Sequence, residues 1–175
     1  MPPSAKLPAE LPVEFLAGCQ RVLPADVKAG ELPTRSIGRT ADLCERLSGY
    51  VVARQKTGVF SQPDDFPGGR LPRPGEYAVL VNFSGEPRCL VRYDECTVLP
   101  FHAVGPEHVE VETAALRTVA GWRKLHRDYW EPVLAARGES FSNDMPIVFQ
   151  RFTALYPPAP QSCPGALRSP ADPGG

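Results

Sequence analysis

Cysteine is present in this sequence but lacks the pattern that a disulfide framework or a zinc site requires. The 175 residues contain five cysteines, an odd number, and no Cys-x-x-Cys pair occurs among them. Disulfide-rich domains carry even sets of cysteines, and structural zinc sites pair them at short spacing. We therefore expect free thiols in a reducing compartment, and we predict a cytoplasmic location.

Long hydrophobic runs and an excess of one charge are also missing. No apolar stretch approaches the ~18 residues of a membrane-spanning helix, and prolines and acids stand where a signal peptide has a basic start. The net charge is -1 and the isoelectric point is about 6.3. Any surface for nucleic acid must therefore be a local basic patch.

The common catalytic motifs are absent as well. The sequence has no Gly-x-Ser-x-Gly elbow, no phosphate-binding glycine-rich loop and no His-Glu-x-x-His. The three histidines, His102, His108 and His126, are too scattered to predict a metal site. We expect no cofactor, although a weakly bound divalent cation stays open. The chemistry left to consider is that of a lysine paired with an acid.

Lys56 lies where a helical pattern ends and an extended pattern begins. Thr40 is a suitable N-cap for a helix whose apolar residues recur at i, i+4, i+7 and i+8, namely Leu43, Leu47, Tyr50 and Val51. After Lys56, Val59 and Phe60 lead into a loop rich in proline and glycine. Functional residues are often found in such connections between elements.

Alternating apolar and polar residues predict an antiparallel sheet. Residues 77–83 and 89–93 form a hairpin around Ser84-Gly85-Glu86-Pro87, a further strand is expected at 97–99, and residues 147–156 are the longest strand candidate. Strands with intervening helices favour an α+β fold, and closing the sheet would remove its exposed edges.

Two further helices are expected outside this sheet. The first lies near residues 13–23, and the second carries an apolar stripe at i, i+3, i+7 and i+11, made of Trp122, Leu125, Tyr129 and Val133. Pro132 should kink or restart the second helix, and Gly138 can end it. We interpret Trp122 as a core residue and His126 as a hydrogen-bonded packing residue.

Proline-rich segments lie on both sides of a single predicted domain. Residues 1–12 and 158–175 are predicted to be flexible tails, and residues 13–157 one domain with an N-terminal helical extension. Residues 24–39 are interpreted as a surface connection. Residues 62–75 contain four prolines and three glycines, so we expect an irregular, mobile flap.

Four basic residues, Arg54, Lys56, Arg70 and Arg73, fall within twenty positions, against Asp64 and Asp65. They can form a shared binding patch or be ordinary solvated charges.

The stretch around Lys56 resembles the lysine-threonine signature of the ASCH domain, a small β-barrel family related to the PUA domains that bind RNA. Family members carry a glycine, one residue, then Lys-Thr-small-Thr after a helix. Lys56, Thr57 and Gly58 match this signature, whereas Arg54 replaces the glycine and Val59 the second threonine. Further matches follow in family order: Leu71-Pro72, Gly75, Pro100-Phe101, Val104, Glu112, Trp122-Arg123, His126, Phe141-Ser142, Asp144-Met145-Pro146, Phe152 and Tyr156. The resemblance is strongest to the longer bacterial ASCH proteins.

The resemblance implies one enzymatic hypothesis. Some short ASCH proteins are amidohydrolases of acetylated cytidine that use the lysine, the second threonine and the glutamate, which makes Lys56 and Glu112 catalytic candidates if this protein is an enzyme. A valine offers neither a lone pair nor a proton, so Val59 argues against N4-acetylcytidine amidohydrolase activity. A ribonuclease activity, proposed for longer ASCH proteins, stays open.

The resemblance also implies RNA binding, because longer ASCH proteins look like RNA binders. It adds Tyr50 and Ser142 as contact residues, although Tyr50 can instead pack on its helix stripe and Ser142 can cap a turn. The predicted nucleic-acid-binding residues are Tyr50, Arg54, Lys56, Thr57, Arg70, Arg73 and Ser142.

We therefore predict a PUA-like antiparallel β-barrel with flanking helices. It should bind single-stranded RNA or a nucleotide-like ligand in a cleft around Lys56. The alternatives are a hydrolase acting on RNA or on a modified nucleoside, and a protein-interaction module without chemistry. On the binding hypothesis, Lys56→Ala leaves the melting temperature nearly unchanged and weakens RNA binding.

Overall fold

The computed structural model describes residues 10–158, so the predicted tails lie largely outside the described residues. The helices are α1 (Val13–Gln20), α2 (Ala41–Val52), α3 (Pro106–Val109) and α4 (Val119–Ala135), and the 3-10 helices are η1 (Ala29–Glu31), η2 (Pro63–Asp65), η3 (Pro67–Gly69), η4 (Phe101–Ala103) and η5 (Ala114–Leu116). The strands are β1 (Thr34–Arg35), β2 (Gly58–Ser61), β3 (Tyr77–Val81), β4 (Pro87–Pro100) and β5 (Pro146–Tyr156). Within residues 10–158, no helix combines the length and apolarity needed to cross a membrane.

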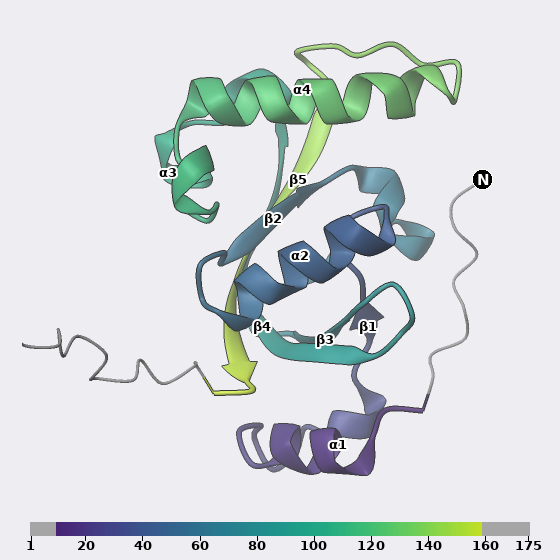
Figure 1. The fold of residues 1–175 in the computed structure, drawn as a ribbon, viewed down its shortest axis with the longest axis vertical. Helices are drawn as coiled ribbons and strands as arrows, with labels where there is room; N and C mark the ends of the chain where they lie inside the picture. Colours follow the sequence, from purple (N-terminus) through teal and green to yellow (C-terminus); the bar gives the residue numbers. More distant parts are fainter. Residues whose placement is uncertain (1–9, 159–175) are drawn as a thin grey trace, which may run out of the picture.

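A single mixed sheet forms the centre of the molecule (Figure 1), in the order β1-β3-β4-β5-β2. β1 and β3 are parallel, and the other neighbours are antiparallel. The predicted hairpin is confirmed by the β3–β4 pair, and the long closing strand by β5. The strand expected at 97–99 is the continuation of β4, which pairs with β5 along most of its length.

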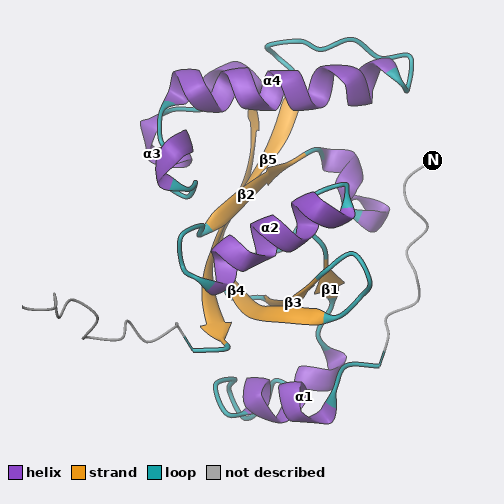
Figure 2. Cartoon of the chain, in the orientation of Figure 1, coloured by secondary structure: helices purple, strands orange, loops and turns teal. Residues whose placement is uncertain are grey.

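The sheet remains open, so the prediction of a closed barrel is not confirmed (Figure 2). β1 and β2 are the two ends of the strand order, and no ladder joins them in the part of the chain that the structure describes. β1 has two residues and β2 has four, which leaves too little backbone at either edge to build a closing ladder. The α+β class is confirmed.

Helix α2 covers the interior face of the sheet. The Thr40 hydroxyl accepts a hydrogen bond from the Leu43 N–H at 3.2 Å, which confirms the predicted N-cap. Val51 of α2 is fully buried against alternate residues of the strands, in a cluster that also contains Val59, Ala78, Leu80, Cys89, Val91, Tyr93 and Phe152. We call this cluster the interior core.

Helices α1 and α4 pack at opposite ends of the long strands (Figure 1). Cys19 of α1 is buried with Leu23 against residues of β3 and β4 that point away from the interior core, among them Val79 and Leu90. Helix α4 packs over the far end of β4 and β5, where its buried tryptophans meet Phe101 and Ile147. The strand alternation predicted from the sequence thus supplies both faces of the sheet with apolar side chains.

The buried stripe of α4 differs from the one predicted. Leu125 is 46% exposed, whereas Trp130 and Leu134, which the prediction left out, are buried. The buried face follows the i, i+4 steps from Trp122 through His126 to these two residues, because steps of four drift slowly around a helix of 3.6 residues per turn. Pro132 lies inside α4 without ending it, and Gly138 has a φ of 74° just beyond its C-terminus.

The two segments interpreted as irregular connections carry more structure than predicted. Residues 24–39 contain η1 and the edge strand β1. Residues 62–75 contain η2 and η3, and Phe66 between them is buried beneath the Arg35 guanidinium, 4.9 Å from the ring centroid. The aromatic anchor holds this segment against the open edge of the sheet.

Candidate functional site

Lys56 lies in the connection between α2 and β2, and backbone hydrogen bonds fix its position. The Tyr50 carbonyl accepts hydrogen bonds from the N–H groups of Gln55 and Lys56, at 2.9 and 3.2 Å. The next residue, Thr57, donates its N–H to the Val111 carbonyl at 2.9 Å and accepts from the Phe152 N–H at 2.9 Å. Lys56 is therefore fixed between the end of α2, strand β5 and the segment that follows α3.

Arg54, which replaces the family glycine, has a φ of 60° in the left-handed region. This conformation explains why a glycine suits the position. Its guanidinium donates to the Val52 carbonyl at 2.7 Å and to the Val51 carbonyl at 3.4 Å, at the end of α2. The predicted nucleic-acid contact thus acts as a helix C-cap in this structure.

Lys56 and Glu112 form a buried ion pair. Lys56 is 4% exposed and Glu112 is 3% exposed, and the ammonium donates to Glu112 Oε2. The turn after α3 positions the acid, since the Glu112 N–H donates to the Val109 carbonyl at 3.0 Å and the Glu112 carbonyl accepts from Arg117 Nε at 2.8 Å. Burial lowers the pKa of Lys56, and the neighbouring Glu112 carboxylate opposes that shift.

His126 of α4 is a further buried ionisable group, and the Lys56 charge acts on its pKa. Its Nδ1 lies 3.0 Å from the Trp122 carbonyl, which only accepts, so Nδ1 carries the proton. The ring stacks on Trp122 and contacts the edge of Phe60. Burial lowers the pKa of His126 to about 3; the hydrogen bond to Trp122 opposes this shift, and the Lys56 charge adds to it.

The packing role predicted for His126 is confirmed. The effect of the Lys56 charge on His126 was not predicted, because α4 and the α2–β2 connection are distant in sequence and no local pattern links them. At neutral pH the imidazole is uncharged, so His126 adds no second positive charge to the interior.

The open cleft expected around Lys56 is not found. The segment carrying Val111 and Glu112 covers the ammonium, and little of the Lys56 side chain reaches solvent. Tyr50 is half-buried and Thr57 is exposed, while Glu110, two positions before Glu112, is exposed. The structure therefore brings Lys56 and Glu112 together as an enclosed pair.

Arg70 and Arg73 make their contacts elsewhere. Arg70 forms an ion pair with Glu76 at 2.6 Å, and the Arg73 N–H donates to the same carboxylate at 3.1 Å. Both arginines are exposed, at the segment that leads into β3. Ser142 accepts a hydrogen bond from the Asp144 N–H at 3.1 Å, which agrees with the turn role considered for it.

A cavity of about 50 Å³ lies instead at the opening between β1 and β2, and we call it the seam cavity. It is lined by Arg35, Ser36, Ile37, Val59, Ser61, Asp65, Phe66, Leu80, Tyr93, Gln150 and Phe152. The buried Gln150 amide donates to Ser61 Oγ at 3.0 Å. Lys56 does not line this cavity, whereas Val59, at the position of the second family threonine, does.

The polar residues of the seam cavity were not among the site residues predicted from the sequence. Gln150 lies in an apolar strand, two positions from both Val148 and Phe152. Residues two positions apart in a strand face the same side of the sheet, so Gln150 faces the side of these apolar residues. A polar residue at an interior strand position could have indicated this site from the sequence, because a buried amide needs hydrogen-bond partners or a ligand. Among residues 10–158, no group of three or more His, Cys, Asp or Glu side chains has a geometry that could hold a metal ion.

Comparison with known proteins identifies the architecture. Residues 34–156 match the family model of the ASCH domain. The structure is similar to an ASCH domain from Lactobacillus crispatus JV V101, with a TM-score of 0.67 and 16% identity over 83% of this chain and 96% of that chain. It is also similar to protein EF3133 from Enterococcus faecalis V583, with a TM-score of 0.60 and 23% identity over 70% of this chain and 75% of that chain. No curated protein sequence matches the chain.

Proposed function

Since the chain belongs to the ASCH domain family, whose fold is PUA-like, we propose that it binds single-stranded RNA or a nucleotide-like ligand. The ligand enters the opening between β1 and β2, with the edge of one base at the seam cavity. The buried position of Lys56 leads us to place the ligand here and not over the lysine ammonium.

The observation that carries this proposal is the chemistry of the seam cavity. Gln150 and Ser61 offer amide and hydroxyl groups, while Arg35 and Asp65 stand as a donor and an acceptor beside the aromatic ring of Phe66. Hydrogen-bonding groups next to aromatic and apolar surfaces are what an unpaired base requires. A volume of about 50 Å³ holds the edge of a base and not a whole nucleoside.

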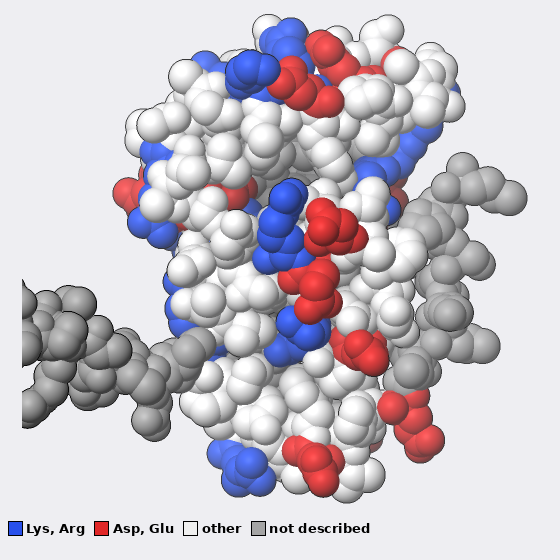
Figure 3. Space-filling model, in the orientation of Figure 1, with Lys and Arg blue, Asp and Glu red and all other residues white. Residues whose placement is uncertain are grey.

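The charges on the α2 side of the molecule indicate that non-specific attraction between surface charge and RNA contributes little to binding. Figure 3 shows Lys and Arg side chains interspersed with Asp and Glu on that face. Arg39, which precedes α2, pairs with Asp65 at 3.0 Å. A surface of mixed sign does not attract a polyanion over its whole extent. We therefore expect selective binding with a shallow dependence on salt, as for few phosphate contacts.

Titration of the protein with single-stranded RNA, single-stranded DNA and free cytidine derivatives tests this proposal. In fluorescence anisotropy, Gln150→Leu should weaken binding about tenfold, because the leucine removes the amide but keeps a similar volume. Gln55→Leu is the matched control, since Gln55 is exposed and does not line the cavity. The proposal fails if no ligand binds the native protein, or if Gln150→Leu binds as tightly as the control.

A hydrolase is the second candidate, and the Lys56–Glu112 pair is the observation that favours it. An enclosed lysine with a lowered pKa, beside a carboxylate, can hold and transfer a proton. In this hypothesis Lys56 and Glu112 act on RNA or on a modified nucleoside. The hydroxyl of the second family threonine has no counterpart, because Val59 packs in the interior core.

Chromatography of N4-acetylcytidine and of a short RNA after incubation with the protein tests the hydrolase. We expect acetylcytidine hydrolysis to be absent or far below that of short ASCH proteins, and Val59→Thr to be the substitution most able to raise it. Rapid deacetylation by the native protein would reverse the order of the two candidates.

A further inference from the structure

A second cavity, of about 210 Å³, lies between η4, the first half of α4 and the turn before β5. Its lining consists of Phe101, His102, Arg123, Arg127 and Asn143, and we call it the arginine cavity. It shares no lining residue with the seam cavity. Arg123 and Arg127 are one turn apart on α4, so both guanidiniums reach the same side of the helix.

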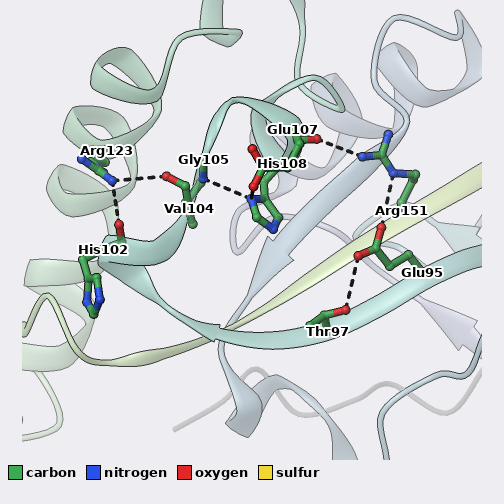
Figure 4. Close-up of polar contacts among 9 residues, drawn as sticks. All are labelled: Glu95, Thr97, His102, Val104, Gly105, Glu107, His108, Arg123 and Arg151. Atoms are coloured by element: carbon green, nitrogen blue, oxygen red, sulfur yellow. Dashed lines mark hydrogen bonds and ion pairs between the residues drawn. The ribbon is translucent and has the colours of Figure 1, made fainter.

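Neutral acceptors hold the guanidinium of Arg123. Its Nη2 donates to the His102 carbonyl at 2.7 Å and to the Val104 carbonyl at 3.2 Å, as Figure 4 shows. No carboxylate within residues 10–158 forms an ion pair with this arginine. The carbonyls therefore fix the orientation of the group without cancelling its charge, and the contacts use only one of its three nitrogens.

Arg127 is held in a similar way. Its Nη2 donates to Asn143 Oδ1 at 2.9 Å, and its guanidinium lies 4.5 Å from the centroid of the Phe141 ring. The Glu131 carboxylate approaches Nη1 only to 3.8 Å. Like Arg123, this arginine keeps unused N–H donors at the cavity.

One further carboxylate lies at the rim. Asp144 Oδ1 is 3.1 Å from His102 Nδ1, which also lies 3.1 Å from the Asn143 carbonyl. The Asp144 side chain is 85% exposed, so solvent screens its charge. The cavity itself is lined by two cations and no acid.

We propose that the arginine cavity binds a phosphate group, supplied by the backbone of a bound RNA strand. Two guanidiniums that are oriented in advance, Arg123 without an ion pair in the described part of the chain and Arg127 with a carboxylate no nearer than 3.8 Å, match the charge and the geometry of phosphate oxygens. Such contacts hold a strand in place without reading its sequence. The choice of RNA as the source rests on the proposed function, whereas a free nucleotide or inorganic phosphate has the same chemistry.

Asn143→Asp and Arg127→Gln are the test variants. Asn143→Asp keeps the size of the side chain and the acceptor for Arg127, and it introduces a carboxylate that repels phosphate. Arg127→Gln removes one cation from the cavity. The matched control is Lys124→Gln, which makes the same change of charge on the same helix, where the lysine is 79% exposed and paired with Asp128.

Binding of single-stranded RNA is measured by anisotropy over a range of salt concentrations. Binding of inorganic phosphate and of cytidine 5′-monophosphate is measured from backbone amide NMR shifts of His102 and Asn143. Both test variants should bind RNA about tenfold more weakly and lower the salt slope by about one, whereas Lys124→Gln binds as the native protein does.

The outcomes separate this proposal from the proposed function. RNA binding that is equal in native, Asn143→Asp and Arg127→Gln proteins overturns the phosphate site and leaves RNA binding standing. Absent RNA binding, together with phosphate-dependent shifts that the variants abolish, supports the site with a small phosphate as its ligand and overturns RNA as the source of the phosphate. The absence of both signals overturns both proposals.

Discussion

Lys56 and Glu112 form an ion pair inside the protein. Each is almost completely buried, and a charge inside a protein is tolerated only when a partner replaces the water it has lost. The burial changes the expectation drawn from the sequence, in which Lys56→Ala had little effect on the melting temperature. A residue that is needed for stability can still be functional, but its substitution no longer reports on binding alone.

We expect Glu112→Gln to lower the free energy of unfolding by about 3–5 kcal/mol, because the Lys56 ammonium keeps its position but loses its counter-charge. Urea unfolding at neutral pH measures this loss. The double variant Lys56→Met, Glu112→Leu should recover a large part of it, since both charges are then gone.

Lys124 provides the control for this prediction. It also pairs with a carboxylate, Asp128 at 2.6 Å, but on the surface of α4. Lys124→Met should therefore change stability far less than Glu112→Gln does. Equal effects of Glu112→Gln and Lys124→Met would mean that the buried pair contributes no more than a surface pair.

At the scale of elements, the junction between α2 and β2 requires a residue without a side chain. A Cβ on Gly58 would overlap the Gln150 carbonyl of β5 and lie 2.9 Å from the side chain of Val111. β2 pairs with β5 through this residue, and the segment carrying Val111 closes over the same point. The match of Gly58 to the family signature thus has a packing explanation.

We expect Gly58→Ala to destabilise the protein by about 2 kcal/mol or more, because backbone has to move to admit the methyl group. Gly49→Ala is the matched control: Gly49 lies inside α2, and nothing stands within 4 Å of the position that a methyl group would take there. In a helix interior this change should stabilise by about 0.5–1 kcal/mol. Thermal and urea unfolding of both variants decide the point, and a Gly58→Ala protein as stable as the native one would refute it.

At the scale of the whole molecule, three apolar clusters hold an open sheet between helices. The layer between α4 and the sheet contains an imidazole, since the ring of His126 lies there beside Phe60 and Trp122. Burial holds the pKa of this imidazole far below 6.5, to about 3. Protonation of His126 in acid should therefore destabilise the packing of α4 against the sheet.

The sign of the pH dependence follows from that pKa. Below pH 6.5 the unfolded chain binds a proton at His126, whereas the folded protein binds it only near pH 3. The free energy of unfolding therefore falls as the pH falls between these two values. The slope from this group is at most about 1.4 kcal/mol per pH unit. His126→Phe, which keeps an aromatic ring in the layer, should remove that part of the slope in urea unfolding at pH 7, 5 and 4. An unchanged slope would show that His126 does not carry the acid sensitivity.

The sequence by itself determined the elements that repeat a local pattern. The Thr40 helix, the hairpin and the long strand β5 each show their periodicity over many residues, and periodicity reports which side of an element is buried. The lysine-threonine signature pointed to the ASCH domain, which residues 34–156 confirm. β1 escaped prediction because a strand of two residues has no period to detect.

Only the tertiary structure decided what those elements enclose. Lys56 and Glu112 are 56 positions apart, and their burial depends on how the segment after α3 folds over the end of α2. The sheet stays open because its two edge strands are short, and this opening produces the seam cavity. Residue patterns specify the surface that each element buries, whereas a cavity or an ion pair arises where surfaces from separate elements meet. That meeting is set by packing between distant segments, which no local pattern contains.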